Sequence, residues 1–264
     1  MTTFTDAALR ADALNLGPHW VYDQAALAMA FPNGVTEPRD PISPYHPNRK
    51  AGQYTHIGDQ TKFLADATQG GYSRAGWKEA WLTAMQSYDG YLDGATKATL
   101  ETQAETPSSS NEFSVISRIA PIIDLGLNLD ETIAIAQDQA ALTHGGDLIP
   151  EGVEFFVRVL FAVREGVDIE DAIYDQAESG RYPKLKPAEA YDQAYTADKT
   201  AFLEVAKEFG QACGFDSAFP LTLYFAINFS KSMNHAMTVN ALAGGDTTAR
   251  AMVLAQLIHA RDHG

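Results

Sequence analysis

Apolar residues recur at three- and four-residue spacing along most of this chain, and this spacing constrains the fold more than any other feature. In the clearest segment the apolar positions are Phe155, Phe156, Val159, Leu160 and Val163. Similar spacing marks residues 9–16, 77–88, 133–141 and 202–209. It is typical of helices that bury one face, whereas half-buried strands alternate with a period of two. No sustained period-two run is present, and no Asn-Gly or Asp-Gly turn joins β-branched segments. We therefore predict an all-α bundle with functional loops.

Length and charge limit the possible partners. A chain of 264 residues can bury a sizeable core, as one compact domain or two small ones. It carries 34 acidic and 19 basic residues, which gives a formal net charge of −15. Nonspecific nucleic-acid binding needs a basic face, so we expect no nucleic-acid partner and no binding to an anionic membrane surface. A phosphorylated ligand would need a local pocket of helix N-termini, basic side chains or metal.

The cysteine content and the lack of long apolar runs indicate in which cellular compartment the protein is expected. Cys213 is the only cysteine, so no intrachain disulfide can form, which fits a reducing cytoplasm. We see neither a signal peptide nor a run of roughly 18 apolar residues, and we expect a cytoplasmic protein without a membrane span. Neither His46 nor His56 has metal-ligand spacing to a second histidine or cysteine, so no zinc site is expected. Serine-hydrolase, Walker and dinucleotide motifs are missing too.

A Gly-Gly break near the end of the chain is the most distinctive local motif. Residues 240–250 place Gly244 and Gly245 between a predicted helix over residues 230–243 and a second helical pattern. Asp246 is the predicted N-cap of that second helix. Glycines let the backbone approach a ligand closely, and a carboxylate at a helix N-terminus suits a bound cation. A well-capped helix after a tight turn is the alternative explanation.

A second Gly-Asp pair follows a long proline-rich segment. Residues 32–55 contain five prolines, a density that forbids a helix and predicts a stiff loop. Loops of this length inside a compact domain are often functional. This one carries Tyr45, His46 and Tyr54, and we predict that it forms a wall or lid whose side chains bind a ligand. It leads into Asp59, the predicted N-cap of the next helix, and into His56, an imidazole suited to acid or base chemistry.

Four sequence blocks resemble the ADP-ribosylglycohydrolase family, most closely the branch related to jellyfish J1 crystallin. They are residues 11–23, 55–61, 117–121 and 240–250, with residues 141–144 as a weaker fifth. Their order and spacing extend the resemblance over nearly the whole chain. It implies a single domain of residues 1–264, folded as an orthogonal helical bundle. It also implies hydrolysis of an N- or O-glycosidic bond in a small-molecule or ADP-ribosylated substrate. It says nothing about the oligomeric state.

The resemblance further implies two Mg²⁺ ions, held by a Thr-Asp-Asp motif, an Asp-x-Asp-Thr motif and an early Glu. This chain keeps Asp59 of the first motif and Asp246 of the second. Gln60 and Thr248 stand where the other two aspartates are expected, and the early Glu has no counterpart. Hard cations need several oxygen ligands, so the implied magnesium site is degenerate, with Asp59 and Asp246 as its remaining metal ligands.

The resemblance and the motifs together assign roles to candidate residues. Asp59 and Asp246 are the catalytic candidates that polarise water or bind ribose hydroxyls, and His56 is the candidate that assists them. Arg250 lies four residues after Asp246 on one helix face, where its charge can replace that of the metals. Alternatively, Arg250 points to solvent and pairs loosely with Asp246.

Three further positions complete the predicted ligand site, and several neighbours are interpreted differently. His19, Asn111 and Gly245 are expected to contact the ligand. Trp20 is interpreted as a core residue and Glu112 as an exposed residue of a first helical turn. Two alternatives to an enzyme stay open. One is a catalytically inactive homologue that binds a ligand, and the other is a structural, crystallin-like protein.

Overall fold

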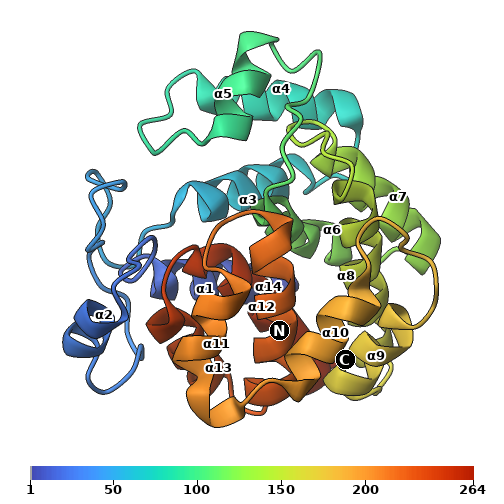
Figure 1. Cartoon of the computed structure of the whole chain (residues 1–264). Coiled ribbons are helices and arrows are strands. Elements are labelled where there is room, and N and C mark those ends of the chain that lie inside the picture. The colour runs from blue at the N-terminus through green and yellow to red at the C-terminus, as the bar shows by residue number, and fades with distance from the viewer. Residues whose placement is uncertain (1) are drawn as a thin grey trace.

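The computed structural model describes residues 2–264, and helices dominate it (Figure 1). Within that range no strand forms, and only two isolated bridges, Ser108–His144 and Glu112–Gly214, are present. The all-α prediction is therefore confirmed. The α-helices are α1 (Phe4–Asn15), α2 (Gln24–Ala30), α3 (His56–Ala67), α4 (Arg74–Met85), α5 (Gly94–Glu101), α6 (Ala120–Ile123), α7 (Leu129–Ala140), α8 (Ile149–Arg164), α9 (Ile169–Ala177), α10 (Pro187–Thr196), α11 (Phe202–Phe209), α12 (Phe215–Phe229), α13 (Met233–Ala243) and α14 (Thr247–His263). Two 3₁₀ helices, η1 (Phe113–Ile119) and η2 (Lys199–Ala201), join them.

Helix α14 lies at the centre of the bundle (Figure 1). Every side chain from Thr247 to Ala260 is buried, and the helix packs against α1, α8, α13 and η1. Most of these side chains are aliphatic, as expected of a helix enclosed on all sides. Three of its five buried polar residues lie in the first turn, at Thr247, Thr248 and Arg250, and the other two are Gln256 and His259. The start of the most buried helix is therefore also its most polar part.

A buried carboxylate joins α1 to the start of α3. Asp12 is completely buried, and it accepts hydrogen bonds from the Thr55 amide at 2.7 Å and the Thr55 hydroxyl at 2.6 Å. Gly58 makes this approach possible, because a Cβ atom at this position would overlap the Asp12 carboxylate. Asp12 thus fixes the end of the proline-rich loop against the central helices.

Replacing Asp12 by Ala is expected to lower the free energy of unfolding by roughly 2–4 kcal/mol, because the buried Thr55 amide and hydroxyl lose their acceptor. Urea denaturation measures this change. Asp66→Ala is the control, since Asp66 pairs only with Lys62 on the surface. This substitution should lower the free energy of unfolding by less than about 1 kcal/mol. Equal losses in the two variants would contradict an anchoring role for Asp12.

Two predicted helix starts are wrong by a few residues. Helix α3 begins at His56, and Thr55 is its N-cap, with a hydroxyl that accepts from the Ile57 amide at 3.1 Å. Asp59 therefore lies in the first turn rather than at the cap. Helix α13 begins at Met233 after the capping residue Ser232, not at residue 230. Asp246 does occupy the N-cap position of α14, but its side chain makes no capping hydrogen bond.

The predicted proline-rich loop is present. No helix forms between α2 and α3, and the loop passes from the outlying α2 back to the start of α3 (Figure 1). It is tied to α3 by the ion pair between Arg49 and Asp59 at 2.8 Å. Across the described residues, no helix combines the length and apolar character needed to cross a bilayer.

Candidate functional site

The Gly244–Gly245 turn places the segment after α1 beside the start of α14. Both glycines have positive φ, at 82° and 74°. The Gly245 amide donates to the Val21 carbonyl at 2.9 Å, and the Gly245 carbonyl accepts from the Trp20 amide at 2.8 Å. Trp20 itself has a φ of 58°, which is uncommon for a residue with a Cβ atom. The paired backbone of the glycine turn therefore helps to hold Trp20 in an unfavourable conformation.

A cleft of about 250 Å³ opens beside this turn. Its aromatic lining consists of Trp20, Tyr22, Tyr45 and Tyr91. Its acidic lining consists of Asp93, Glu112 and Asp246. Ligand sites typically combine apolar or aromatic walls with a few polar groups that fix orientation. This cleft has that combination, with its charge supplied by carboxyl groups.

The three carboxyl groups differ in their preference for a proton. Burial, together with the nearby Asp93 and Asp246, raises the pKa of Glu112 to about 7. Burial also raises the pKa of Asp246 to about 6. Burial opposes ionisation of Asp93 as well, yet the nearby His56 ring and hydrogen bonds from Thr96 hold its pKa below the ordinary value. Near neutral pH the cleft thus contains both a proton donor and an ionised carboxylate.

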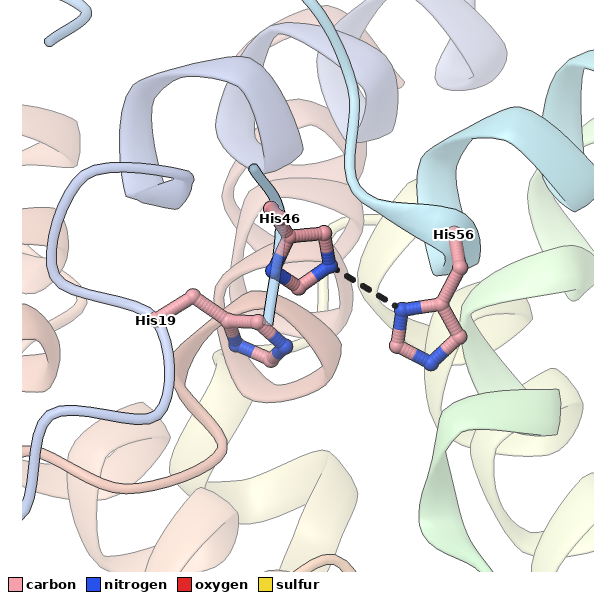
Figure 2. Close-up of side chains that lie close together, drawn as sticks. All are labelled: His19, His46 and His56. Carbon is pink, nitrogen blue, oxygen red and sulfur yellow. Dashed lines mark hydrogen bonds between the residues drawn. The ribbon is translucent and has the colours of Figure 1, made fainter. Parts of the chain in front are cut away.

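A cluster of three buried histidines lies next to the cleft (Figure 2). His19, His46 and His56 each present one ring nitrogen, and the three nitrogens lie within 4.8 Å of one another. Among residues 2–264, this is the only group of three or more His, Cys, Asp or Glu side chains that meets this spacing. The Trp20 ring packs against all three, with ring centroids 4.4, 5.2 and 5.2 Å away. Sequence spacing could not reveal the cluster, because each ring comes from a different segment.

Burial makes these imidazoles neutral. Burial and the neighbouring histidines lower the pKa of His19 well below its ordinary value. Burial and the nearby His56 lower the pKa of His46 to about 3, and burial also lowers the pKa of His56. Each ring therefore has one nitrogen with a lone pair at pH 7, and His46 and His56 share a hydrogen bond between Nε2 and Nδ1 at 3.4 Å. Neutral imidazole is the form that accepts protons and binds metals.

The first of the two motifs that the resemblance assigns to Mg²⁺ is occupied by other interactions. Asp59 accepts from Arg49 and from the Tyr88 hydroxyl, both at 2.8 Å. The Gln60 side-chain oxygen accepts from Trp81 at 3.0 Å and from Arg118 at 3.1 Å. These oxygens are already satisfied, whereas each Mg²⁺ requires near-octahedral oxygen coordination. The second motif offers a single carboxylate, Asp246, whose Oδ1 atom has no hydrogen-bond partner among residues 2–264. The two motifs together offer too few free oxygens for a pair of magnesium ions.

Arg250 lies inside the protein, so the interpretation in which it points to solvent is wrong. The side chain is completely buried, and it donates to the Asn240 side-chain oxygen at 2.9 Å and the Gly244 carbonyl at 2.6 Å. Its charge opposes the effect of burial on the pKa of Asp246. The other expected aspartate, Asp59, has Arg49 as its cation instead. Arg250 thus supports the glycine turn and acts electrostatically on one aspartate.

The remaining predicted site residues separate into two groups. Tyr45 is half-exposed and lines the cleft, and both it and His46 line an adjoining pocket. By contrast, Asn111 bonds to the Asp147 side chain and the Leu148 amide, and Tyr54 packs beside Gly58. Gly245 belongs to the turn already described. Neither Asn111 nor Tyr54 is among the described residues that line either cavity.

Four cleft residues were missed or misjudged from the sequence. Trp20 is partly exposed and lines the cleft, so its interpretation as core is wrong. Glu112 is partly buried in the same cleft rather than exposed on a helix. Tyr91 and Asp93 were not singled out. A signal existed for Asp93, because it precedes a helical pattern as Asp246 does, and it caps α5 through the Thr96 amide.

Comparisons with known proteins agree with the fold. The family model described as ADP-ribosylglycohydrolase matches residues 8–262 of this chain. No curated protein matches the chain in sequence. A solved structure named "ADP-ribosylglycohydrolase-related protein complex" superposes with a TM-score of 0.68 at 18% sequence identity. The superposition covers 99% of this chain and 89% of the other, and at this identity it shows a common fold alone.

Proposed function

We propose that this chain, which belongs to the ADP-ribosylglycohydrolase family, hydrolyses the glycosidic bond of an ADP-ribosyl or related ribosyl group in the cleft beside Trp20. Membership rests on the family model, which matches nearly the whole chain. One observation of the structure carries the proposal for the cleft. Its carboxyl groups combine a raised pKa at Glu112 with a lowered pKa at Asp93, between aromatic walls.

Glycoside hydrolysis needs two complementary carboxyl groups. One protonates the leaving group, and the other activates water or stabilises the positive charge that develops on the sugar. Glu112 has the pKa of a proton donor near neutral pH, and Asp93 stays ionised. We assign the general acid to Glu112 and the carboxylate role to Asp93. Asp246 keeps its proposed contact with ribose hydroxyls, and no step in this scheme passes through a magnesium ion.

The adjoining pocket suits the rest of such a substrate. It has a volume of about 340 Å³ and shares Tyr45 and Tyr91 with the acidic cleft. Arg49 and Lys97 line it together with Asp89, which pairs with Arg49 at 2.9 Å, and the Lys97 ammonium lies 5.8 Å from the centre of the Tyr91 ring. Cationic side chains bind phosphate oxygens, and aromatic rings stack on bases and sugars. We place the diphosphate in this pocket and the scissile ribose beside Glu112.

Release of ADP-ribose from N-linked and O-linked ADP-ribosyl substrates tests the proposal. Chromatography of the products should show ADP-ribose, and calorimetry should show ADP-ribose binding with or without added Mg²⁺. Binding without turnover would replace the enzyme by the ligand-binding homologue. If neither turnover nor binding is observed, the proposal is overturned, and the structural, crystallin-like alternative is left.

Several finer assignments belong to the same proposal. The four sequence blocks support a place in the J1-crystallin-like branch, and the continuous core from Ala8 to Ala260 supports a single domain. The lone cysteine supports a cytoplasmic location.

The proposed acid predicts the pH dependence of the rate. A general acid works only when protonated, so kcat/KM should fall as the pH rises through the Glu112 pKa of about 7. A pH profile from 5 to 9 checks this expectation, with ~7 as the midpoint of the alkaline limb. The pH profile of the residual rate of Glu112→Gln should have no such alkaline limb. An unchanged limb in that variant would assign the titration to another group.

A further inference from the structure

We infer that His19, His46 and His56 form a three-nitrogen site for a divalent transition metal of the zinc class. The inference does not rest on the proposed hydrolysis, because metal binding is measured without any substrate. The ligands of this site are ring nitrogens from two connecting segments and one helix start, rather than the oxygens of the two aspartate motifs.

The rings converge as metal ligands do. Figure 2 shows His19 from the segment after α1, His46 from the proline-rich loop and His56 from the first turn of α3, with their rings turned toward one another. The His46 Nε2 and His56 Nδ1 atoms lie 3.4 Å apart. Two ligands on a tetrahedral zinc, each at ~2.0–2.1 Å from the metal, would be separated by about 3.3 Å. That pair is already at the right separation.

The third ring has a nitrogen free for the same purpose. The His19 Nδ1 atom accepts from the Thr248 amide at 3.4 Å, and it lies 3.2 Å from the Thr248 hydroxyl and 3.7 Å from Asp246 Oδ1. Its Nε2 atom is buried and has no hydrogen-bond partner among residues 2–264. Figure 2 shows that this ring extends toward the other two. A buried polar atom without a partner is costly, and a metal ion would satisfy it.

Two of the three outward nitrogens face carboxylates, as is usual around bound metals, and the third, His46 Nδ1, is buried without a hydrogen-bond partner among residues 2–264. His56 Nε2 lies 3.6 Å from Asp93 Oδ2, and His19 Nδ1 faces Asp246. Metal-binding histidines commonly direct their second nitrogen at a carboxylate, which sets the tautomer and raises ligand basicity. In this arrangement the inward nitrogens are His19 Nε2, His46 Nε2 and His56 Nδ1.

The chemistry of the donors selects the metal. Imidazole suits Zn²⁺, Cu²⁺ and Ni²⁺, whereas Mg²⁺ and Ca²⁺ require oxygen. A purely aromatic role for the three rings is the competing explanation, because Trp20 stacks on His19 and packs at a tilt against His46 and His56. Packing alone does not require three inward nitrogens, and a phenyl ring would fill the same space without an unsatisfied atom. Substitution by Phe therefore separates the two explanations.

The test uses the full chain freed of any polyhistidine tag and stripped with a chelator. Calorimetry with ZnCl₂ should give one ion per chain, with a dissociation constant below about 1 μM, and MgCl₂ should give no comparable binding. His46→Phe keeps a ring beside Trp20 and should weaken zinc binding at least about 100-fold. The matched control is His235→Ala, because His235 is exposed on α13 and should leave zinc binding unchanged.

Each outcome decides for or against the site. X-ray absorption of the zinc-loaded protein should show three imidazole nitrogens at about 2.0–2.1 Å, and this measurement stands even if His46→Phe fails to fold. The site is overturned by an absence of zinc binding in the stripped protein, or by wild-type affinity in His46→Phe. The site would also be overturned if the protein bound magnesium as tightly as zinc, or if His235→Ala lost as much zinc affinity as His46→Phe.

Discussion

Replacing Glu112 by Gln is expected to lower kcat for ribosyl hydrolysis about 10²–10⁴-fold, the range typical of a lost general acid. Gln has nearly the same shape but no proton to give to the leaving group. The Glu112 carboxylate has two polar contacts, with the Cys213 sulfur at 3.7 Å and His144 Nε2 at 3.9 Å, and Gln keeps an oxygen for one of them, so the substitution should leave the fold intact. Steady-state kinetics with an ADP-ribosylated substrate measure the loss, and circular dichroism checks the fold.

The nature of the leaving group shows whether the lost function is proton donation. An acidic leaving group departs without protonation, so a substrate of that kind should restore most of the rate of Glu112→Gln. Asp93→Asn should be slow with good and poor leaving groups alike, because its carboxylate acts on water or on the sugar. Glu101→Gln, at the exposed end of α5, is the control and should match the wild type. A Glu112→Gln variant that is equally slow with both substrates would rule out the assigned role.

The helices could be predicted because their signal is local. The apolar spacing of residues 155–163 lies within α8, and the spacing alone indicates which face is buried. The cap of α3 was misplaced for a reason that is not local. Thr55 serves as the cap while its backbone and hydroxyl are held by Asp12, a residue 43 positions earlier in the chain.

The candidate site depends even more on contacts between distant segments. The cation that pairs with Asp59 could not be predicted, because nothing in the local pattern shows that Arg49 from the proline-rich loop reaches it. The histidine cluster needs three segments to converge, and a ligand motif defined by short spacing cannot detect this. Trp20 reaches the cleft only because its backbone is left-handed and forms a hydrogen bond with Gly245. Composition and periodicity indicate neither of these features.

Replacing Gly245 by Ala is expected to lower the free energy of unfolding by at least about 3 kcal/mol. Two effects act together. A φ of 74° disfavours any residue with a Cβ atom by about 1–2 kcal/mol. In addition, the new Cβ would overlap the Gln211 carbonyl oxygen, which accepts the Asp246 amide at 2.9 Å. The turn cannot move away freely, because Gly245 is also bonded to Trp20 and Val21.

Gly180→Ala separates the two effects. Gly180 has a nearly equal φ of 71°, but a Cβ there would meet no atom within 4 Å. The decrease in the free energy of unfolding of Gly180→Ala should therefore reflect backbone strain alone, about 1–2 kcal/mol. The difference between the two variants in urea denaturation measures the overlap with Gln211, and it should amount to about 1 kcal/mol or more. If the variants lose the same stability, the glycine turn is free to relax, and it cannot be what holds Trp20 against the histidine cluster.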